Sequence, residues 1–220
     1  MSTDKPPGDS LGARVSDRLG GSQKRPHNIA GLLLAAGSGK RFGGRKLVDA
    51  KVKGQAIGLL AAQKFHNVLA TYIVVRAEDK STQSMFEAAG FSVIVAQHAA
   101  LGMGHSLAAG MEVIKGLDVN ACLVGLADMP LIRESTLRAL CERLEQGADI
   151  ARPRYCGRAG QPVGFGRKYF ESLCEINGDT GARGFLRVHH DAVEYLDVED
   201  EGIVIDVDTA DDLSTLEGSP

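Results

Sequence analysis

The chain has 220 residues, of which 44% are hydrophobic and 24% charged, and its formal charge is −3. These values are ordinary for a globular protein with one core and argue against a nucleic-acid-binding surface. No apolar run is long enough to cross a membrane, and residues 1–28 lack the apolar centre of a signal peptide. We therefore expect a cytoplasmic protein with neither nucleic-acid nor membrane partners.

The first 28 residues are rich in proline, glycine, serine and charged residues and show no hydrophobic periodicity. We predict a disordered tail over residues 1–28 and a single domain over residues 29–220. The cysteines lack the close spacing of a zinc site, so free thiols are expected. They are Cys122, Cys141, Cys156 and Cys174.

The predicted domain opens with an apolar run over residues 29–36, followed by a loop over residues 37–46 with four glycines and four cations. The run predicts a buried parallel strand. Glycines let backbone N–H groups approach a ligand, and lysine and arginine add charge that suits phosphates. A triphosphate-binding loop and a basic surface loop are both compatible with this pattern at this point.

Helical and strand patterns then alternate along the chain. Helices are predicted over residues 56–68, 80–89, 106–115 and 135–146, and strands over residues 71–76, 91–96 and 121–127, with a short irregular crossing over residues 47–53. Strands that alternate with helices indicate parallel βαβ units. The predicted fold is a doubly wound, mostly parallel sheet of Rossmann-like type, in three α/β/α layers.

The C-terminal third has a different pattern. Strands over residues 150–155 and 162–165 flank a loop, which predicts a hairpin or an arm laid over the sheet. A polar turn over residues 177–183 precedes a short predicted helix, and short strands are predicted over residues 193–198 and 203–205. A closing helix is predicted after Asp208 and Thr209, either of which can cap it.

Three candidate elements follow predicted strands: the loop over residues 37–46, the loop over residues 101–106, and Asp128. Ligands of open parallel sheets bind beyond the carboxyl ends of strands, so the coincidence favours a nucleotide site. Asp128 beside a phosphate-binding loop suits Mg²⁺, and Asp206 or Asp208 could supply a second carboxylate. The alternative for all three aspartates is a turn or a helix cap.

The standard phosphate-binding patterns do not match. A P-loop requires serine or threonine after Gly39-Lys40, where Arg41 stands. Gly37, Gly39 and Gly43 miss the dinucleotide-binding spacing by one residue. The sequence also lacks a Ser/His/Asp order or Cys/His spacing that would indicate a covalent nucleophile.

Taken together, these segments resemble the signature of the MobA-like nucleotidyltransferases, and especially the molybdenum-cofactor cytidylyltransferases. The resemblance covers residues 29–217. The matching segments are Leu34-Ala35-Ala36-Gly37-x-Gly39-x-Arg41-x-Gly43 with Lys46, Gly102-Met103-Gly104-His105-Ser106, Leu126-Ala127-Asp128-Met129-Pro130, Gly160-Gln161-Pro162-Val163-Gly164-Phe165, Gly178-Asp179-x-Gly181-Ala182-Arg183 and Asp206-x-Asp208-Thr209.

The resemblance implies Mg²⁺-dependent transfer of CMP from CTP to the terminal phosphate of molybdopterin, with release of pyrophosphate. It implies catalytic roles for Arg41, Lys46 and Asp128, and metal binding by Asp128 with Asp206 or Asp208. Acceptor binding would fall to the segment over residues 158–165 and the turn over residues 179–183, with Gln161, Pro162, Asp179 and Arg183 as the binding residues. The residues implied in nucleotide binding are Leu34, Ala35, Ala36, Gly37, Gly39, Arg41, Lys46, Gly102, Gly104 and Ser106.

The chain also departs from the family pattern. Gly104-His105 stands where relatives commonly carry small hydroxyl residues, and Gln161 stands where many carry histidine. Both departures concern the base or the acceptor rather than phosphate chemistry. The alternatives are another nucleotide, a sugar or isoprenoid phosphate as acceptor, a carrier that delivers molybdopterin to a molybdoenzyme, and a dinucleotide-dependent reductase.

Overall fold

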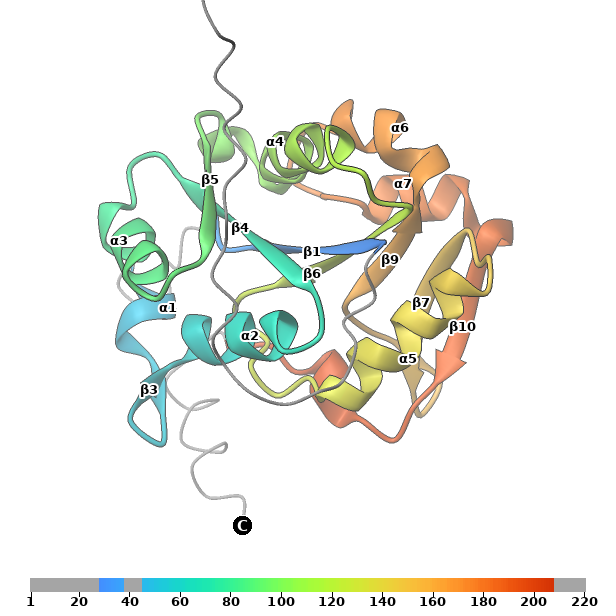
Figure 1. Ribbon diagram of the computed structural model, residues 1–220, viewed down its shortest axis with the longest axis horizontal. Coiled ribbons are helices and arrows are strands. Elements are labelled where there is room, and N and C mark those ends of the chain that lie inside the picture. The colour runs from blue at the N-terminus through green and yellow to red at the C-terminus, as the bar shows by residue number, and fades with distance from the viewer. Residues whose placement is uncertain (1–27, 38–44, 208–220) are drawn as a thin grey trace, which may run out of the picture.

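The computed structural model describes residues 28–37 and 45–207 (Figure 1). Within these ranges, eight strands form one sheet in the order β10-β7-β9-β6-β1-β4-β5, with β8 paired to β7. The strands are β1 (Ile29–Leu34), β4 (Ala70–Arg76), β5 (Ser92–Ala96), β6 (Ala121–Leu126), β7 (Ile150–Tyr155), β8 (Arg158–Ala159), β9 (Val163–Gly166) and β10 (Val193–Asp197).

The centre of the sheet is parallel. β1 lies between β6 and β4, with Leu34 in register with Leu126 on one side and Val74 on the other, and β4 pairs in parallel with β5. Every residue of β1 is buried, as expected for a strand covered on both faces. Because these strands run in the same direction, the segments that follow them meet at one edge of the sheet.

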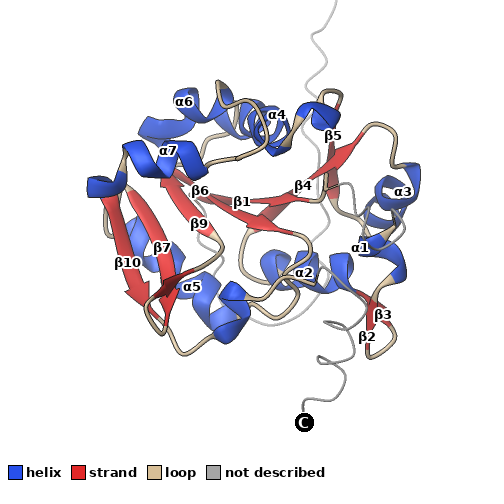
Figure 2. Ribbon diagram, turned by 180° about the vertical axis from the view of Figure 1, so that it is seen from behind, coloured by secondary structure: helices blue, strands red, loops and turns tan. Residues whose placement is uncertain are grey.

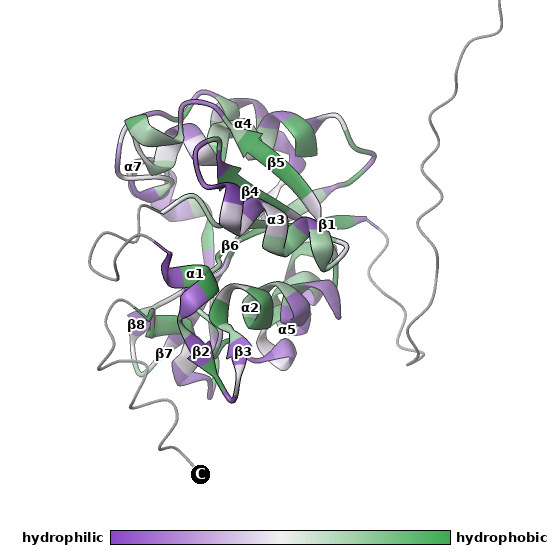
Figure 3. Ribbon diagram, turned by 90° about the vertical axis from the view of Figure 1, so that its left-hand side faces the viewer, coloured by the Kyte–Doolittle hydropathy of each residue, from purple (hydrophilic) through white to green (hydrophobic). Residues whose placement is uncertain are grey.

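Helices cover both faces of the sheet, as Figures 1 and 2 show. One core layer holds side chains of α2, α3 and α5, and the other holds side chains of α4, α6 and α7. Apolar residues are concentrated on the strands between the layers (Figure 3). The predicted three-layer fold is therefore confirmed. The helices are α1 (Lys46–Asp49), α2 (Ile57–His66), α3 (Lys80–Ala88), α4 (Met103–Lys115), α5 (Glu134–Glu145), α6 (Phe170–Cys174) and α7 (Arg183–Val188).

The C-terminal third contains the antiparallel part of the sheet. β9 pairs antiparallel with both β6 and β7, and β8 folds back on β7 as a short hairpin. This confirms the hairpin alternative predicted for this segment. We call residues 156–165 the arm. β10 closes this edge of the sheet by pairing in parallel with β7.

Several predicted boundaries differ from the structure. The irregular crossing contains α1 and a small hairpin of β2 (Lys51–Val52) and β3 (Gln55–Ala56), and α4 begins three residues earlier than predicted. The predicted strand over residues 203–205 is wrong, because this segment belongs to a 3₁₀ turn, η5 (Glu201–Val204). The buried carboxylate of Asp200 accepts hydrogen bonds from the backbone N–H groups of Gly202 and Arg133, which fixes a turn here.

The remaining short elements are η2 (Ala99–Leu101), η3 (Arg167–Tyr169) and η4 (His190–Ala192). The predicted tail before residue 28 and the closing helix lie outside the described residues. None of the helices in residues 28–37 and 45–207 is both long and apolar enough to cross a bilayer.

Candidate active site

An ion pair lies where β1 and β6 end. Lys46 Nζ donates a hydrogen bond to Asp128 Oδ2 at 2.8 Å, although the two residues are 82 positions apart in the sequence. The Lys46 side chain is 10% exposed and that of Asp128 25% exposed. The backbone N–H of Ala127 donates to the carbonyl of Leu34, which holds Asp128 at the end of the strand pair, and Lys46 reaches it from the start of α1. A lysine and a carboxylate at this edge supply both charges needed around a metal-bound phosphate.

Residues 128–130 form a loop that is anchored from both sides. The backbone carbonyl of Asp128 accepts a hydrogen bond from the N–H of Val207 at 3.0 Å. The carbonyl of Pro130 accepts one from Lys64 Nζ at 2.6 Å. Burial lowers the pKa of the Lys64 ammonium, while the carboxylates of Asp200 and Glu134 oppose that shift. These anchors hold the Asp128 carboxylate at the strand ends.

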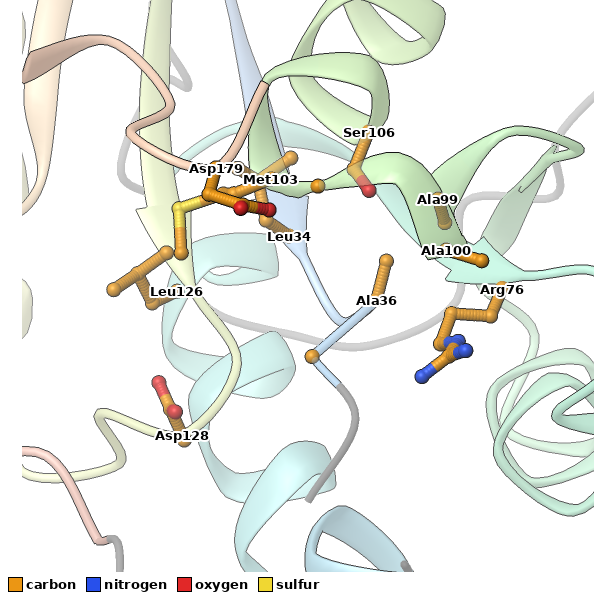
Figure 4. Close-up of a pocket in the computed structure, with 12 residues that line it drawn as sticks. Leu34, Ala36, Arg76, Ala99, Ala100, Met103, Ser106, Leu126, Asp128 and Asp179 are labelled. Carbon is orange, nitrogen blue, oxygen red and sulfur yellow. The ribbon is translucent and has the colours of Figure 1, made fainter. Parts of the chain in front are cut away.

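A cavity of about 400 Å³, here called the strand-end pocket, opens beside this ion pair (Figure 4). Its walls come from the ends of β1, β4 and β6 and from the start of α4. One end carries the Asp128 carboxylate, and the opposite end is bordered by small residues of η2. The lining residues are Leu34, Ala36, Gly37, Arg76, Ala99, Ala100, Gly102, Met103, Ser106, Leu126, Asp128 and Asp179.

Ser106 presents an unsatisfied hydroxyl to the strand-end pocket. The residue is 1% exposed, and its Oγ has no hydrogen-bond partner among the residues that the structure describes. The hydroxyl points into the pocket in Figure 4. A buried polar atom without a partner is costly, so Ser106 is ready to bond a polar group of a ligand.

The start of α4 is pressed against the turn over residues 177–179. The backbone N–H of Gly104 donates to the carbonyl of Gly178 at 2.8 Å. Gly102 has φ +128°, and a Cβ at this position would collide with Gly178 and with the Asp179 carboxylate. Glycine is therefore required at 102, and the contact brings Asp179 into the strand-end pocket rather than toward the arm.

A second cavity of about 270 Å³, here called the arm pocket, lies on the other side of Leu34, Met103 and Leu126, which line both cavities. Its rim carries Arg152, Arg158 and Arg183, and its floor is apolar. The arm is held by backbone contacts. The N–H of Gln161 donates to the carbonyl of Ile203 at 2.8 Å, and Arg152 Nε donates to the carbonyl of Gly160 at 3.0 Å.

The structure thus distributes the predicted site residues over the strand-end pocket, a small recess beside it and the arm pocket. Gln161, Arg183 and Asp206 line the arm pocket, with Pro162 buried beside it after a cis peptide bond. A small recess next to the strand-end pocket is lined by Ala35, Lys46 and Asp128, among others. Gly104 is buried under Asn177. The remaining predicted residues, Gly39, Arg41 and Asp208, lie outside the described residues.

Sequence reasoning missed two arginines of these pockets. Arg76 is the last residue of β4 and lines the strand-end pocket, and Arg152 lies on β7 and lines the arm pocket. A signal for Arg76 was present, because it ends a β-branched strand at the same sheet edge that singled out Asp128. Arg152 gave no such signal, since its position depends on the antiparallel arm.

The recess also contains Asp79, which caps α3. Its carboxylate accepts hydrogen bonds from the backbone N–H and the hydroxyl of Thr82 and from the hydroxyl of Ser81. Burial alone would raise the pKa of Asp79, but these hydrogen bonds and the nearby Arg76 guanidinium bring that pKa below its usual value. Asp79 therefore stays ionised beside Lys46 and the site.

The donor set fits a hard divalent cation held jointly with a substrate. Within the described part of the chain, no three histidine, cysteine or acidic side chains cluster as a complete metal cage. Asp128 offers a partly exposed carboxylate, and the Val207–Asp128 backbone bond brings Asp206 to the same loop. Mg²⁺ commonly takes one or two carboxylates and completes its shell with phosphate oxygens and water. The residues present are compatible with that arrangement.

Comparison with known proteins identifies the family. A model described as the MobA-like NTP transferase domain matches residues 31–193. The chain belongs to the MobA-like NTP transferase family. It is therefore a nucleotidyltransferase, and Lys46 and Asp128 lie within the matched region.

Two curated relatives have similar length. The purine catabolism protein PucB of Bacillus subtilis is 28% identical over 197 residues, which cover 84% of this chain and 93% of PucB. Nicotine blue oxidoreductase of Paenarthrobacter nicotinovorans is 28% identical over 206 residues, covering 86% and 96% of the two chains.

Solved structures share the fold of this member of the MobA-like family. Rv0371c of Mycobacterium tuberculosis in complex with manganese gives a TM-score of 0.73 at 22% identity, covering 88% of this chain and 100% of Rv0371c. Molybdopterin-guanine dinucleotide biosynthesis protein A of Archaeoglobus fulgidus gives 0.62 at 20% identity, covering 86% and 96%. At these identities the likeness establishes the fold and not the substrate.

Proposed function

We propose that this nucleotidyltransferase works in the cytoplasm and transfers CMP from CTP to the terminal phosphate of a molybdopterin-type cofactor, with Mg²⁺ and with release of pyrophosphate. The single observation that carries the proposal is the Lys46–Asp128 pair beside the strand-end pocket, which adjoins the arm pocket across Leu34, Met103 and Leu126. One pocket suits a nucleotide and the other an anionic acceptor. The names of the molybdopterin-guanine dinucleotide protein and of the manganese-bound neighbour are consistent with the acceptor class and with a divalent cation.

In this proposal the strand-end pocket binds the nucleotide. The nucleoside occupies the end beside Ala36, Ala99 and the Ser106 hydroxyl, which has no partner among the described residues, and the triphosphate extends toward Lys46. The N–H groups around Gly37 and the Lys46 ammonium neutralise phosphate charge. The predicted contacts of Gly39 and Arg41 with the phosphates would add to this neutralisation.

The reaction requires positioning more than a protein nucleophile. An oxygen of the acceptor's own phosphate attacks the α-phosphorus, and a new P–O bond forms as the bond to the departing pyrophosphate breaks. When bound, Mg²⁺ would be held by Asp128, with Asp206 or Asp208, and would supply charge stabilisation at the reacting phosphates. Lys46 stabilises negative charge that accumulates on the leaving pyrophosphate.

The arm pocket is proposed to bind the acceptor. Arg152, Arg158 and Arg183 attract an anion, while the apolar floor, which includes Val163, Phe165 and Leu186, favours a ligand with a flat, weakly polar body. A phosphorylated pterin has both features. Gln161 offers an amide that can donate to and accept from a heteroaromatic edge.

The test is pyrophosphate release measured with each of the four NTPs and Mg²⁺, with and without molybdopterin. CTP with molybdopterin should give the fastest release. Pyrophosphate release that depends instead on a sugar phosphate or an isoprenoid phosphate would change the proposed acceptor but not the enzyme class. Retention of molybdopterin without any pyrophosphate release would favour a carrier.

A redox function has one observation in its favour, which is the name of the oxidoreductase relative. The sequence speaks against it, because Gly37, Gly39 and Gly43 do not have the dinucleotide-binding spacing. Titration with NADH and NADPH decides the question. Saturable binding of either dinucleotide, together with the absence of CTP binding, would support the reductase.

A further inference from the structure

Arg76 lies in the strand-end pocket at a place that the proposed chemistry does not use. It is the last residue of β4, its side chain is 24% exposed, and in Figure 4 its guanidinium projects into the cavity across from Asp128. Its Nε is 3.7 Å from a carboxylate oxygen of Glu78, which is too long for a hydrogen bond. The guanidinium therefore faces the space in which a ligand would lie.

The sheet order places Arg76 at the nucleoside end of this pocket. Asp128 follows β6, whereas Arg76 ends β4, on the far side of β1. Neighbouring strands are about 4.8 Å apart, so the two strand ends are separated by about 10 Å. Ala99 and Ala100, which follow β5, line the same end as Arg76. Lys46, the proposed phosphate contact, lies at the other end beside Asp128, so Arg76 borders the space that remains for the base.

Two kinds of hydrogen-bonding group therefore border the nucleoside end. The arginine side chain is a fork of N–H donors with no acceptor. The buried Ser106 hydroxyl, which lacks a partner among the described residues, can donate or accept. A fork of donors pairs best with two acceptors that are adjacent on one edge of a base. Cytosine offers N3 and O2, and guanine offers O6 and N7, whereas adenine sets its amino donor beside the acceptor on both its Watson–Crick and its Hoogsteen edge.

We propose that Arg76 reads the nucleobase and sets a preference for cytosine or guanine over adenine. This inference rests on the nucleotide site of the proposed function and adds a specificity residue to it. The acceptor is not involved, so the inference can be tested by nucleotide binding alone.

The experiment measures equilibrium binding of CTP, GTP, UTP and ATP, each with Mg²⁺, by titration calorimetry of the full chain. The wild-type protein should bind CTP or GTP more tightly than ATP. Arg76→Met removes the donors and keeps a long side chain, and it should reduce that preference by about 5- to 150-fold, the range for one bidentate contact to a base. ATP binding should change much less.

Two further variants separate the fork from charge and from folding. Arg76→Lys keeps the charge without the planar fork, so it should lose most of the discrimination while it keeps its affinity for ATP. Arg143→Met replaces an exposed arginine that pairs with Glu194 and lines neither pocket, and it should leave all four affinities unchanged.

Several outcomes would overturn the inference. An equal loss of affinity for all four nucleotides would make Arg76 a phosphate ligand, and an unchanged ratio in Arg76→Met would remove it from the site. A wild-type preference for ATP, or full discrimination by Arg76→Lys, would contradict the donor-fork argument. If wild-type protein binds none of the four nucleotides, the proposed function fails and the inference fails with it.

Discussion

The two pockets of this nucleotidyltransferase are built in different ways. The strand-end pocket is formed where parallel strands of the buried sheet stop. Its Asp128 follows β6, the partner of β1, and pairs with Lys46 at the start of α1. The arm pocket is bordered by a short hairpin and the turn η5, which are joined through the Gln161–Ile203 backbone bond. In the proposed function the reaction is therefore tied to the core of the fold, whereas acceptor recognition depends on a peripheral segment.

The largest effect is expected from the catalytic end of the strand-end pocket. Asp128→Asn should reduce pyrophosphate release by about 10²- to 10³-fold, because the substitution removes the carboxylate that faces the metal and the phosphates. The free energy of unfolding should change little, since the Asp128 side chain is partly exposed. A coupled pyrophosphate assay and a urea titration measure the two quantities.

A matched control for Asp128→Asn is Asp197→Asn. Asp197 forms a comparable charged pair with Arg154 at the edge of the sheet, but it lines neither pocket. Its substitution should leave activity within the error of the assay. Full activity in Asp128→Asn would contradict the assignment of the reaction to the strand ends.

An intermediate effect is expected in the arm. A Cβ at Gly160 would collide with the carbonyl and side chain of Ile203, so Gly160→Ala should lower the free energy of unfolding by about 1–3 kcal/mol. It should raise the KM for the acceptor and leave CTP binding unchanged. Steady-state kinetics with the acceptor varied, together with CTP titration, measure this separation of the two pockets.

Gly184 in α7 provides the matched glycine for this comparison. A Cβ there meets no heavy atom within 4 Å, so Gly184→Ala should leave the kinetics unchanged and raise stability by about 0.5–1 kcal/mol through helix propensity. If Gly160→Ala weakens CTP and acceptor binding equally, the two pockets are not independent and the contrast is lost.

The smallest effect is expected at the cap of α3. Asp79→Ala should cost about 1 kcal/mol of stability at neutral pH, because the cap bond to the N–H of Thr82 is lost. The folded-state pKa of Asp79 lies below the ordinary value of 3.8. The carboxylate therefore stabilises the fold above the unfolded-state pKa, and this contribution is lost as the pH falls through the folded-state pKa.

Urea unfolding of wild-type protein and Asp79→Ala at pH 7 and near pH 3 measures this dependence. The difference in unfolding free energy between the two proteins should shrink at the acidic pH. Asp118→Ala, which alters an exposed loop, should show no such change. A difference in unfolding free energy that grows on acidification would contradict a lowered pKa of Asp79 in the folded state.

The contrast between the pockets also explains what could be predicted from the sequence. The fold and the meeting of Lys46 with Asp128 followed from apolar strands and from the rule that parallel strands end at one edge. Arg76 obeys the same rule, and it was missed only because arginine at a strand end is commonly solvated. The β-branched residues around Ile203 predict a strand there. The turn that forms instead depends on the buried Asp200, whose partners Arg133 and Thr136 are more than 60 positions away in the sequence.

The segment over residues 200–207 has a consequence for engineering. Its Ile203 carbonyl holds the arm through Gln161, and its Val207 N–H holds the loop of Asp128. One short stretch of backbone thus contacts both the arm and the Asp128 loop, and in the proposed function it sets the spacing between the acceptor and the reacting phosphates. Grafting an arm from another family member to change the acceptor should succeed only when residues 200–207 are transplanted with it. A new arm on the old segment would hold the acceptor at the wrong distance from the nucleotide.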